Sequence, residues 1–276
     1  MDINIILLFW GMLVGVVFSV IGAAGGILAS FGLITLVGIT DPNTVKPMAQ
    51  MMTLSMVAVF LPTYMKRASC VIILGLMLAF GGMLGAWLGS TFSSYYLSDM
   101  NVFRPLFGLL ALVVAIQVFW KLFNAPKTVE RPSANQGVHS IKLEDGRLLF
   151  VHAGRDFTIP IAYPILVGFL IAMVSAIFGV GGGFLLVPFM ASMLGMPMYI
   201  VPATAAIPIF IGGAVSITNY LQLGAQPDYD VLILLALGGM LGALLGPRLN
   251  RLCKDYWLKV GLCGVISLIG VRYVLG

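Results

Sequence analysis

Long apolar stretches without a single charged residue alternate with shorter polar stretches along this 276-residue chain. No residue is charged in the ranges 3–40, 68–98 and 157–227. A helix that spans the roughly 30 Å hydrocarbon core of a bilayer needs about 20 apolar residues. The third range is therefore long enough for three membrane segments, and the pattern predicts an all-α polytopic membrane protein.

Each half of the chain is predicted to contain five apolar segments. The second segment of each half has only about 15 residues, or ~22 Å of helix, which is shorter than the hydrocarbon thickness. Two full crossings and a re-entrant pair both return the chain to the same face, and the short length favours broken or re-entrant elements. The expected segments are 3–21, 24–38, 45–65, 71–96 and 102–123, then 160–178, 182–195, 200–222, 230–247 and 256–275.

One nine-residue phrase occurs in both halves. Residues 81–89 read GGMLGAWLG and residues 238–246 read GGMLGALLG, so the offset is 238 − 81 = 157 residues. Two glycine-rich clusters, at 22–26 and 179–183, have the same offset. Two matches at one spacing indicate a tandem duplication, which in a membrane is typical of a secondary transporter. The glycines of the phrase recur every four residues, so we expect them to pack helices closely.

A polar stretch, residues 124–158, separates the two halves. It contains two strand-like runs joined by Asp145-Gly146, which is a strong hairpin signal. With this turn His139 is expected to face His152, and two histidines alone are too few for a metal site. The chain therefore divides into a membrane repeat at 1–123, a linker with a β-hairpin at 124–158, and a second membrane repeat at 159–276.

Composition and charge agree with this pattern. The chain is 60% hydrophobic and 9% charged, with a mean hydropathy of +1.06, whereas a soluble domain has about 25% charged residues. The net charge of +5 comes from basic residues that flank apolar segments, so no nucleic-acid partner is expected. Lys and Arg gather after segment 45–65, in the central stretch, and after segment 230–247. Five segments per half place these three clusters on one face, which the positive-inside rule assigns to the cytoplasm, and the halves are then inverted repeats.

Glycine-rich breaks before the second segment of each half are the main candidates for substrate binding. A break followed by a helix leaves backbone N–H groups without partners, and these donors suit an anion. The alternative is close helix packing through small residues. The candidates are Gly22, Ala23, Ala24, Gly25 and Gly26 in the first half, and Gly179, Val180, Gly181, Gly182 and Gly183 in the second.

Lys46, Gln50 and Thr204 are further candidates for substrate contact, because each is polar within an apolar segment. Lys46 either supplies a cation to an anion path or extends to the membrane interface, and Thr204 either contacts substrate or only bonds a neighbouring helix. Every Asp and Glu is near a loop or a segment end, so no proton relay is indicated. No nucleophile, metal-ligand or phosphate-binding motif occurs, so we expect no catalytic residue, no metal and no cofactor.

A run in the second half resembles the signature of the sulfite exporter TauE/SafE family of membrane transporters: residues 177–189 read IFGVGGGFLLVPF. The resemblance extends over both halves but not over the central stretch. The first half departs from the pattern, with Ala23-Ala24 in place of Val180-Gly181. The resemblance implies transport of a small sulfur-containing anion, such as sulfite or an organosulfonate.

We therefore expect a multi-pass protein of the cell membrane, most simply a bacterial inner membrane, that exports a small inorganic or organic anion by alternating access. Two alternatives stay open from the residues. One is an uptake permease for a sulfur anion, because residues do not encode the direction of transport. The other, from a different class, is an intramembrane enzyme or a membrane assembly factor.

Overall fold

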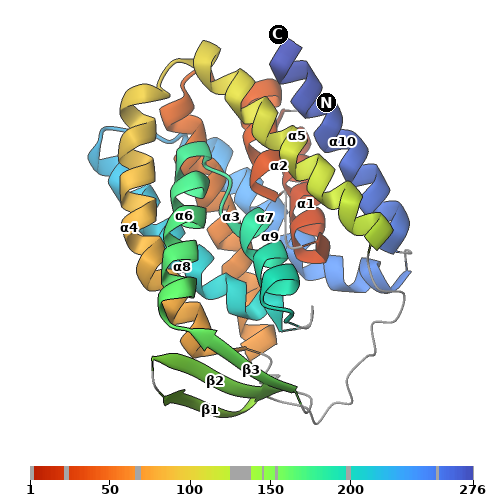
Figure 1. Ribbon diagram of the computed structural model, residues 1–276. Helices are drawn as coiled ribbons and strands as arrows, with labels where there is room; N and C mark the ends of the chain where they lie inside the picture. The colour runs from red at the N-terminus through yellow and green to blue at the C-terminus, as the bar shows by residue number, and fades with distance from the viewer. Residues whose placement is uncertain are drawn as a thin grey trace.

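The computed structural model describes residues 3–21, 25–65, 70–124, 138–144, 146–152, 155–196, 200–252 and 255–275. Within these residues the chain is mainly helical, with a small sheet between the halves (Figure 1). The first half forms α1 (Ile3–Ile21), α2 (Gly25–Gly32), α3 (Pro42–Met65), α4 (Ile72–Tyr96) and α5 (Met100–Asn124). The second half forms α6 (Ala162–Phe178), α7 (Gly183–Pro188), α8 (Val201–Gln222), α9 (Tyr229–Leu252) and α10 (Asp255–Leu275).

Each predicted apolar segment corresponds to one of these helices, with bounds that agree to within a few residues. By length and composition, three helices of the described chain can cross a membrane: α4, residues 100–120 of α5, and α8. The short second segment of each half is confirmed as a short helix that ends in a π-helical turn. These turns are η1 (Leu33–Val37) after α2, and η2 (Phe189–Met193) after α7.

Large apolar side chains cover the outside of the helices. Phe80 is 65% exposed, Ile116 is 67% exposed and Leu268 is 72% exposed. A protein surface of this kind is stable against lipid rather than water. The exposed faces of α4, α5 and α10 therefore agree with a membrane environment.

Helices of one half pack on helices of the other. α1 packs along α9 and α6 packs along α4, while α3 contacts α8 and α5 contacts α10. α4 and α6 run in parallel, because Gly81 contacts the backbone of Ile165 and Gly89 contacts the backbone of Met173. The glycines of α1 and α9 show the same parallel arrangement. The two halves are thus interleaved rather than laid side by side.

The central stretch forms a three-stranded antiparallel sheet in the order β1 (Val138–Glu144), β2 (Arg147–His152) and β3 (Arg155–Pro160). The predicted hairpin is confirmed, since Glu144 pairs with Arg147 across a two-residue turn. The predicted register is wrong beyond Lys142. A bulge between His139 and Lys142 shifts the strand by one residue, so His139 pairs with Val151 instead of His152.

The third strand was not predicted. It completes the sheet through Leu148 of β2 and Ile159 of β3, which pair and are both buried. The sheet lies at one end of the helix bundle, and the N and C labels lie toward the opposite end (Figure 1). We call these the sheet end and the far end. At the far end Asn43 Nδ2 donates to the carbonyl of Ser94 at 3.2 Å, so the start of α3 contacts the end of α4.

Candidate functional site

The second glycine-rich break is a tight turn between α6 and α7. Gly179, Gly181 and Gly182 have φ angles of 72°, 78° and 69°, a region that is costly for residues with a Cβ. The N–H of Val180 donates to the carbonyl of Ser175 at 3.2 Å, and the N–H of Gly183 donates to the carbonyl of Gly181 at 2.8 Å. Within the described residues, the N–H groups of Gly181 and Gly182 have no hydrogen-bond acceptor. Gly181 and Gly182 precede α7, which has only 6 residues. The N–H groups without acceptors are therefore those of the turn and not those of a long helix.

One face of α3 supports this turn. A Cβ added at Gly179 would lie 2.6 Å from Lys46 Cα, and one added at Gly181 would lie 2.8 Å from Thr53 Cγ2. Lys46, Gln50 and Thr53 are spaced by four and three residues, so they share one helix face. The structure thus brings two predicted candidates from the first half, Lys46 and Gln50, to the break of the second half.

The first break meets the second one. Gly22, Ala23 and Ala24 are outside the described residues, but Gly25 and Gly26 begin α2 and are buried. A side chain at Gly26 would clash with the backbone of Val180, including its carbonyl. The described part of the first break therefore packs directly against the second break.

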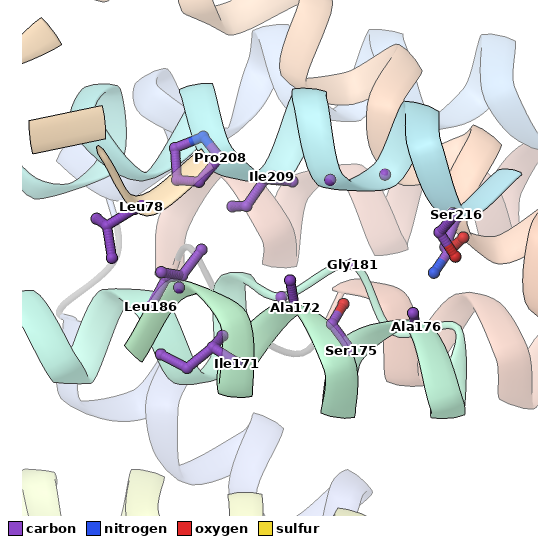
Figure 2. A pocket seen from close by; sticks show the side chains of 15 residues that line it. Leu78, Ile171, Ala172, Ser175, Ala176, Gly181, Leu186, Pro208, Ile209 and Ser216 are labelled. Atoms are coloured by element: carbon purple, nitrogen blue, oxygen red, sulfur yellow. The ribbon is translucent and has the colours of Figure 1, made fainter. Parts of the chain in front are cut away.

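A small cavity of about 20 Å³ lies beside the second break. In Figure 2, α6 and α8 form opposite walls, and Gly181 lies between them. This volume holds about one water molecule. Three predicted candidates line the cavity: Gln50, Gly181 and Gly182. The other lining residues are Leu78, Gly168, Ile171, Ala172, Ser175, Ala176, Leu186, Pro208, Ile209, Gly212, Gly213 and Ser216.

In the described part of the chain, two polar atoms of the cavity wall are buried without a hydrogen-bond partner: Gln50 Oε1 and Ser216 Oγ. The two side chains are 2% and 1% exposed. An unsatisfied buried polar group costs about 1–3 kcal/mol, so such groups in a cavity point to a ligand that satisfies them. Ser175 lines the same cavity from α6, and a Cβ added at Gly182 would lie 3.4 Å from Ser175 Oγ.

The sequence reasoning did not single out Ser175 or Ser216. Ser175 lies four residues before Gly179 and accepts the turn's hydrogen bond from Val180 through its carbonyl. Ser216 lies in the apolar helix α8. The available signal was a lone hydroxyl within an apolar segment, which is a weak one because serine often bonds its own helix backbone.

The ammonium group of Lys46 does not line the cavity. It donates to the carbonyl of Leu97 at 2.7 Å and to the carbonyl of Ser93 at 3.3 Å, at the end of α4. Its Nζ also lies 5.0 Å from the ring centre of Phe103. Lys46 is fully buried, so these carbonyls and the ring replace the water that the ammonium would otherwise bind.

Thr204 also lies outside the cavity lining. Its hydroxyl donates to the carbonyl of Ile200 at 2.8 Å and accepts from the N–H of Val71 at 3.1 Å. These bonds join the start of α8 to the start of α4. A substrate contact by Thr204 stays a prediction, and so do the contacts assigned to Val180 and Gly183, which do not line the cavity.

Comparisons with known proteins agree on one class. A family model described as "Sulfite exporter TauE/SafE" matches residues 7–273. This match covers both halves and the central sheet. No solved structure matches the chain with significance.

Curated relatives match over nearly their full length. The chain is 25% identical to "Probable membrane transporter protein YunE" of Bacillus subtilis, over 98% of this chain and 97% of the relative. It is 26% identical to a "Probable membrane transporter protein" of Xylella fastidiosa strain Temecula1, over 96% of this chain and 92% of the relative. A protein with the same description from Xylella fastidiosa strain 9a5c is 24% identical, over 96% and 92%.

Proposed function

This chain belongs to the sulfite exporter TauE/SafE family of membrane transporters, and from that premise we propose that it exports a small sulfur-containing anion, such as sulfite or an organosulfonate. It is a multi-pass membrane protein. The observation that carries the proposal is the cavity beside the second break, where Gln50 Oε1 and Ser216 Oγ are buried without a partner among the described residues.

The chemistry of this cavity suits an oxyanion. The N–H groups of Gly181 and Gly182 have no acceptor among the residues that the structure describes, and the hydroxyls of Ser175 and Ser216 can both donate. An oxyanion accepts hydrogen bonds on several oxygens at once, and charge-assisted bonds of this kind are about twice as strong as neutral ones. We assign Gln50, Gly181, Gly182, Ser175 and Ser216 to the binding site.

The proposal includes inverted halves and alternating access. The parallel packing of α4 with α6 supports it, because α1 runs from the far end to the sheet end while its counterpart α6 runs the opposite way. Residues 1–123 and 159–276 are then the two repeats, and residues 124–158 are a cytoplasmic linker. The contact of Gly26 with Val180 joins the two breaks beside the cavity, and an axis that relates inverted repeats would pass near it.

The closed cavity fits one stage of such a cycle. At about 20 Å³ it is too small for a sulfur oxyanion with three oxygens, so a bound substrate requires movement of the walls. The far end is held by Lys46 between α3 and α4, and by Ser93 Oγ, which donates to the carbonyl of Ile177 at 2.6 Å. Transport requires these contacts to break when the cavity opens toward the far end.

The test is uptake of radiolabelled sulfite and methanesulfonate by proteoliposomes that contain the purified protein. Gln50→Ala and Ser216→Ala are expected to reduce transport at least ten-fold. Ser30→Ala is the matched control, because Ser30 Oγ is also buried without a partner but does not line the cavity. Equal loss of transport in all three variants, or none in any, would count against this binding site. Inside-out and right-side-out vesicles then give the direction of transport.

A further inference from the structure

We infer that the cavity between α6 and α8 selects anions with a single negative charge and rejects dianions; this inference rests on the proposed transport function. Among the described residues, the polar side chains that line the cavity are Gln50, Ser175 and Ser216, and Gly181 and Gly182, whose N–H groups have no acceptor there, line it too. None of the lining residues that the structure describes is charged. Any charge on the substrate must therefore be stabilised by neutral dipoles.

Neutral dipoles distinguish strongly between one charge and two. The Born cost of moving an ion from water into a low-dielectric site rises with the square of its charge, so a dianion pays about four times the cost of a monoanion of the same size. Hydrogen bonds from N–H and O–H groups grow only in proportion to the charge they meet. The same donors that balance a monoanion consequently leave a dianion far less stable than in water.

Two titratable side chains contact the walls of the cavity without lining it. The backbone of Lys46 packs on Gly179, but its ammonium group bonds to the carbonyls of Leu97 and Ser93. The hydroxyl of Tyr220 donates to the carbonyl of Ala176 at 2.8 Å. Neither the Lys46 ammonium nor the Tyr220 hydroxyl faces the cavity, so neither gives a bound anion a positive charge or a further hydrogen-bond donor.

Gln50 adds a second reason. Its unpartnered Oε1 is a hydrogen-bond acceptor. A singly protonated oxyanion, such as hydrogensulfite, can donate a hydrogen bond from its O–H group to Oε1. A sulfonate has no such group, but rotation of the Gln50 amide presents N–H groups to its oxygens. A dianion has no O–H group, so it can bond only to the donors of the site and leaves Gln50 Oε1 unpaired. The cavity therefore matches hydrogensulfite and sulfonates, and it does not match sulfate or fully deprotonated sulfite.

Three probes test this inference on the whole protein in proteoliposomes. Methanesulfonate keeps one negative charge from mildly acidic to mildly alkaline pH, sulfate keeps two, and sulfite changes from one to two. We expect sulfate to compete with radiolabelled methanesulfonate at least ten-fold more weakly than unlabelled methanesulfonate. Competition by sulfite should weaken by about ten-fold per pH unit once its second proton is lost, while methanesulfonate affinity stays constant.

Variants at Gln50 give a gain-of-function test. Gln50→Lys places a cation in the lining and is expected to shift the preference toward sulfate. Gln50→Met is the matched control, since methionine is of similar length but neutral. It should weaken the binding of both anions and leave methanesulfonate preferred over sulfate. If Gln50→Lys does not fold, the pH profile of the unaltered protein decides.

The outcomes separate the two proposals. Equal competition by sulfate and methanesulfonate in the unaltered protein would overturn charge selection and leave anion transport standing. A sulfite affinity that does not change with pH would overturn it as well. Transport of none of the three anions would overturn both the selection and the proposed function.

Discussion

Gly182 combines a left-handed backbone with a place in the cavity wall. Its φ is 69° and it is followed by α7. Gly182→Ala is expected to cost about 1–2 kcal/mol, because a Cβ is unfavourable in this region, although the nearest atom, Ser175 Oγ, would be 3.4 Å away. The turn would relieve this strain by rotating the N–H groups, so we expect a lower melting temperature and at least ten-fold slower methanesulfonate transport.

Gly212→Ala is the matched control for this change. Gly212 lines the same cavity from the helix α8, and its nearest neighbour would be 3.8 Å from the added Cβ. It therefore adds the same methyl group without backbone strain. If both variants lose transport equally, lost space rather than turn geometry is the cause, and the role given to the free N–H groups is wrong.

Lys46 allows stability and affinity to be separated. Lys46→Met removes the donor to the carbonyls of Leu97 and Ser93, and leaving these buried carbonyls unpaired should cost about 1–3 kcal/mol. Lys46→Gln restores a donor but not the charge. We expect the melting temperature to recover in Lys46→Gln, while both variants bind methanesulfonate as tightly as the parent protein, because the ammonium group bonds to the end of α4 and does not line the cavity. Ten-fold weaker binding in both variants would mean that the charge of Lys46 acts on the substrate, and it would contradict a site built from neutral dipoles.

At this scale the sequence predicted part of the lining of the candidate site. Gln50, Gly181 and Gly182 were recognisable as polar or flexible residues within apolar segments, and they line the cavity. Ser175 and Ser216 could not be recognised, because a serine that bonds its own helix and one that faces a cavity have the same sequence signal. Which side of a helix faces the other half is decided by tertiary packing.

At the scale of elements, glycine faces join helices of different halves. Gly85 of α4 lies against the backbone of Phe169 of α6, where an added Cβ would clash with the carbonyl. Gly85→Ala should therefore force the helices apart, at a cost of about 1–3 kcal/mol, which is typical of overpacking. Gly82→Ala is the control on the same helix, since its Cβ would lie 3.4 Å from Ala172 Cβ. Thermal unfolding in detergent should show a clear loss only for Gly85→Ala.

The helices were the most predictable elements, because charge-free runs of about 20 residues have few other solutions in a bilayer. The sheet was less so. β3 has six residues and begins with Arg155-Asp156, next to the apolar run of α6. The domain boundary predicted after residue 158 therefore divides its short alternation of Phe157 and Ile159 between the linker and the second repeat. The bulge in β1 shifts the register without any Gly or Pro to mark it.

The whole molecule has a polarity along its bundle axis that can be tested directly. Asp41, Asp99 and Asp228 belong to far-end loops, whereas the sheet with its basic residues lies at the opposite end (Figure 1). From the positive-inside rule we expect the sheet end to be cytoplasmic. In a background with all 3 cysteines replaced by serine, Ser133→Cys should react with a membrane-impermeant maleimide only from the cytoplasmic side, and Ser98→Cys, which is exposed at the far end, only from the outside. Five elements per half require these opposite results, since an odd number returns the chain to the other face. Labelling of both positions from one side would exclude the inverted arrangement. It would also exclude alternating access by two inverted repeats that contact each other at Gly26 and Val180.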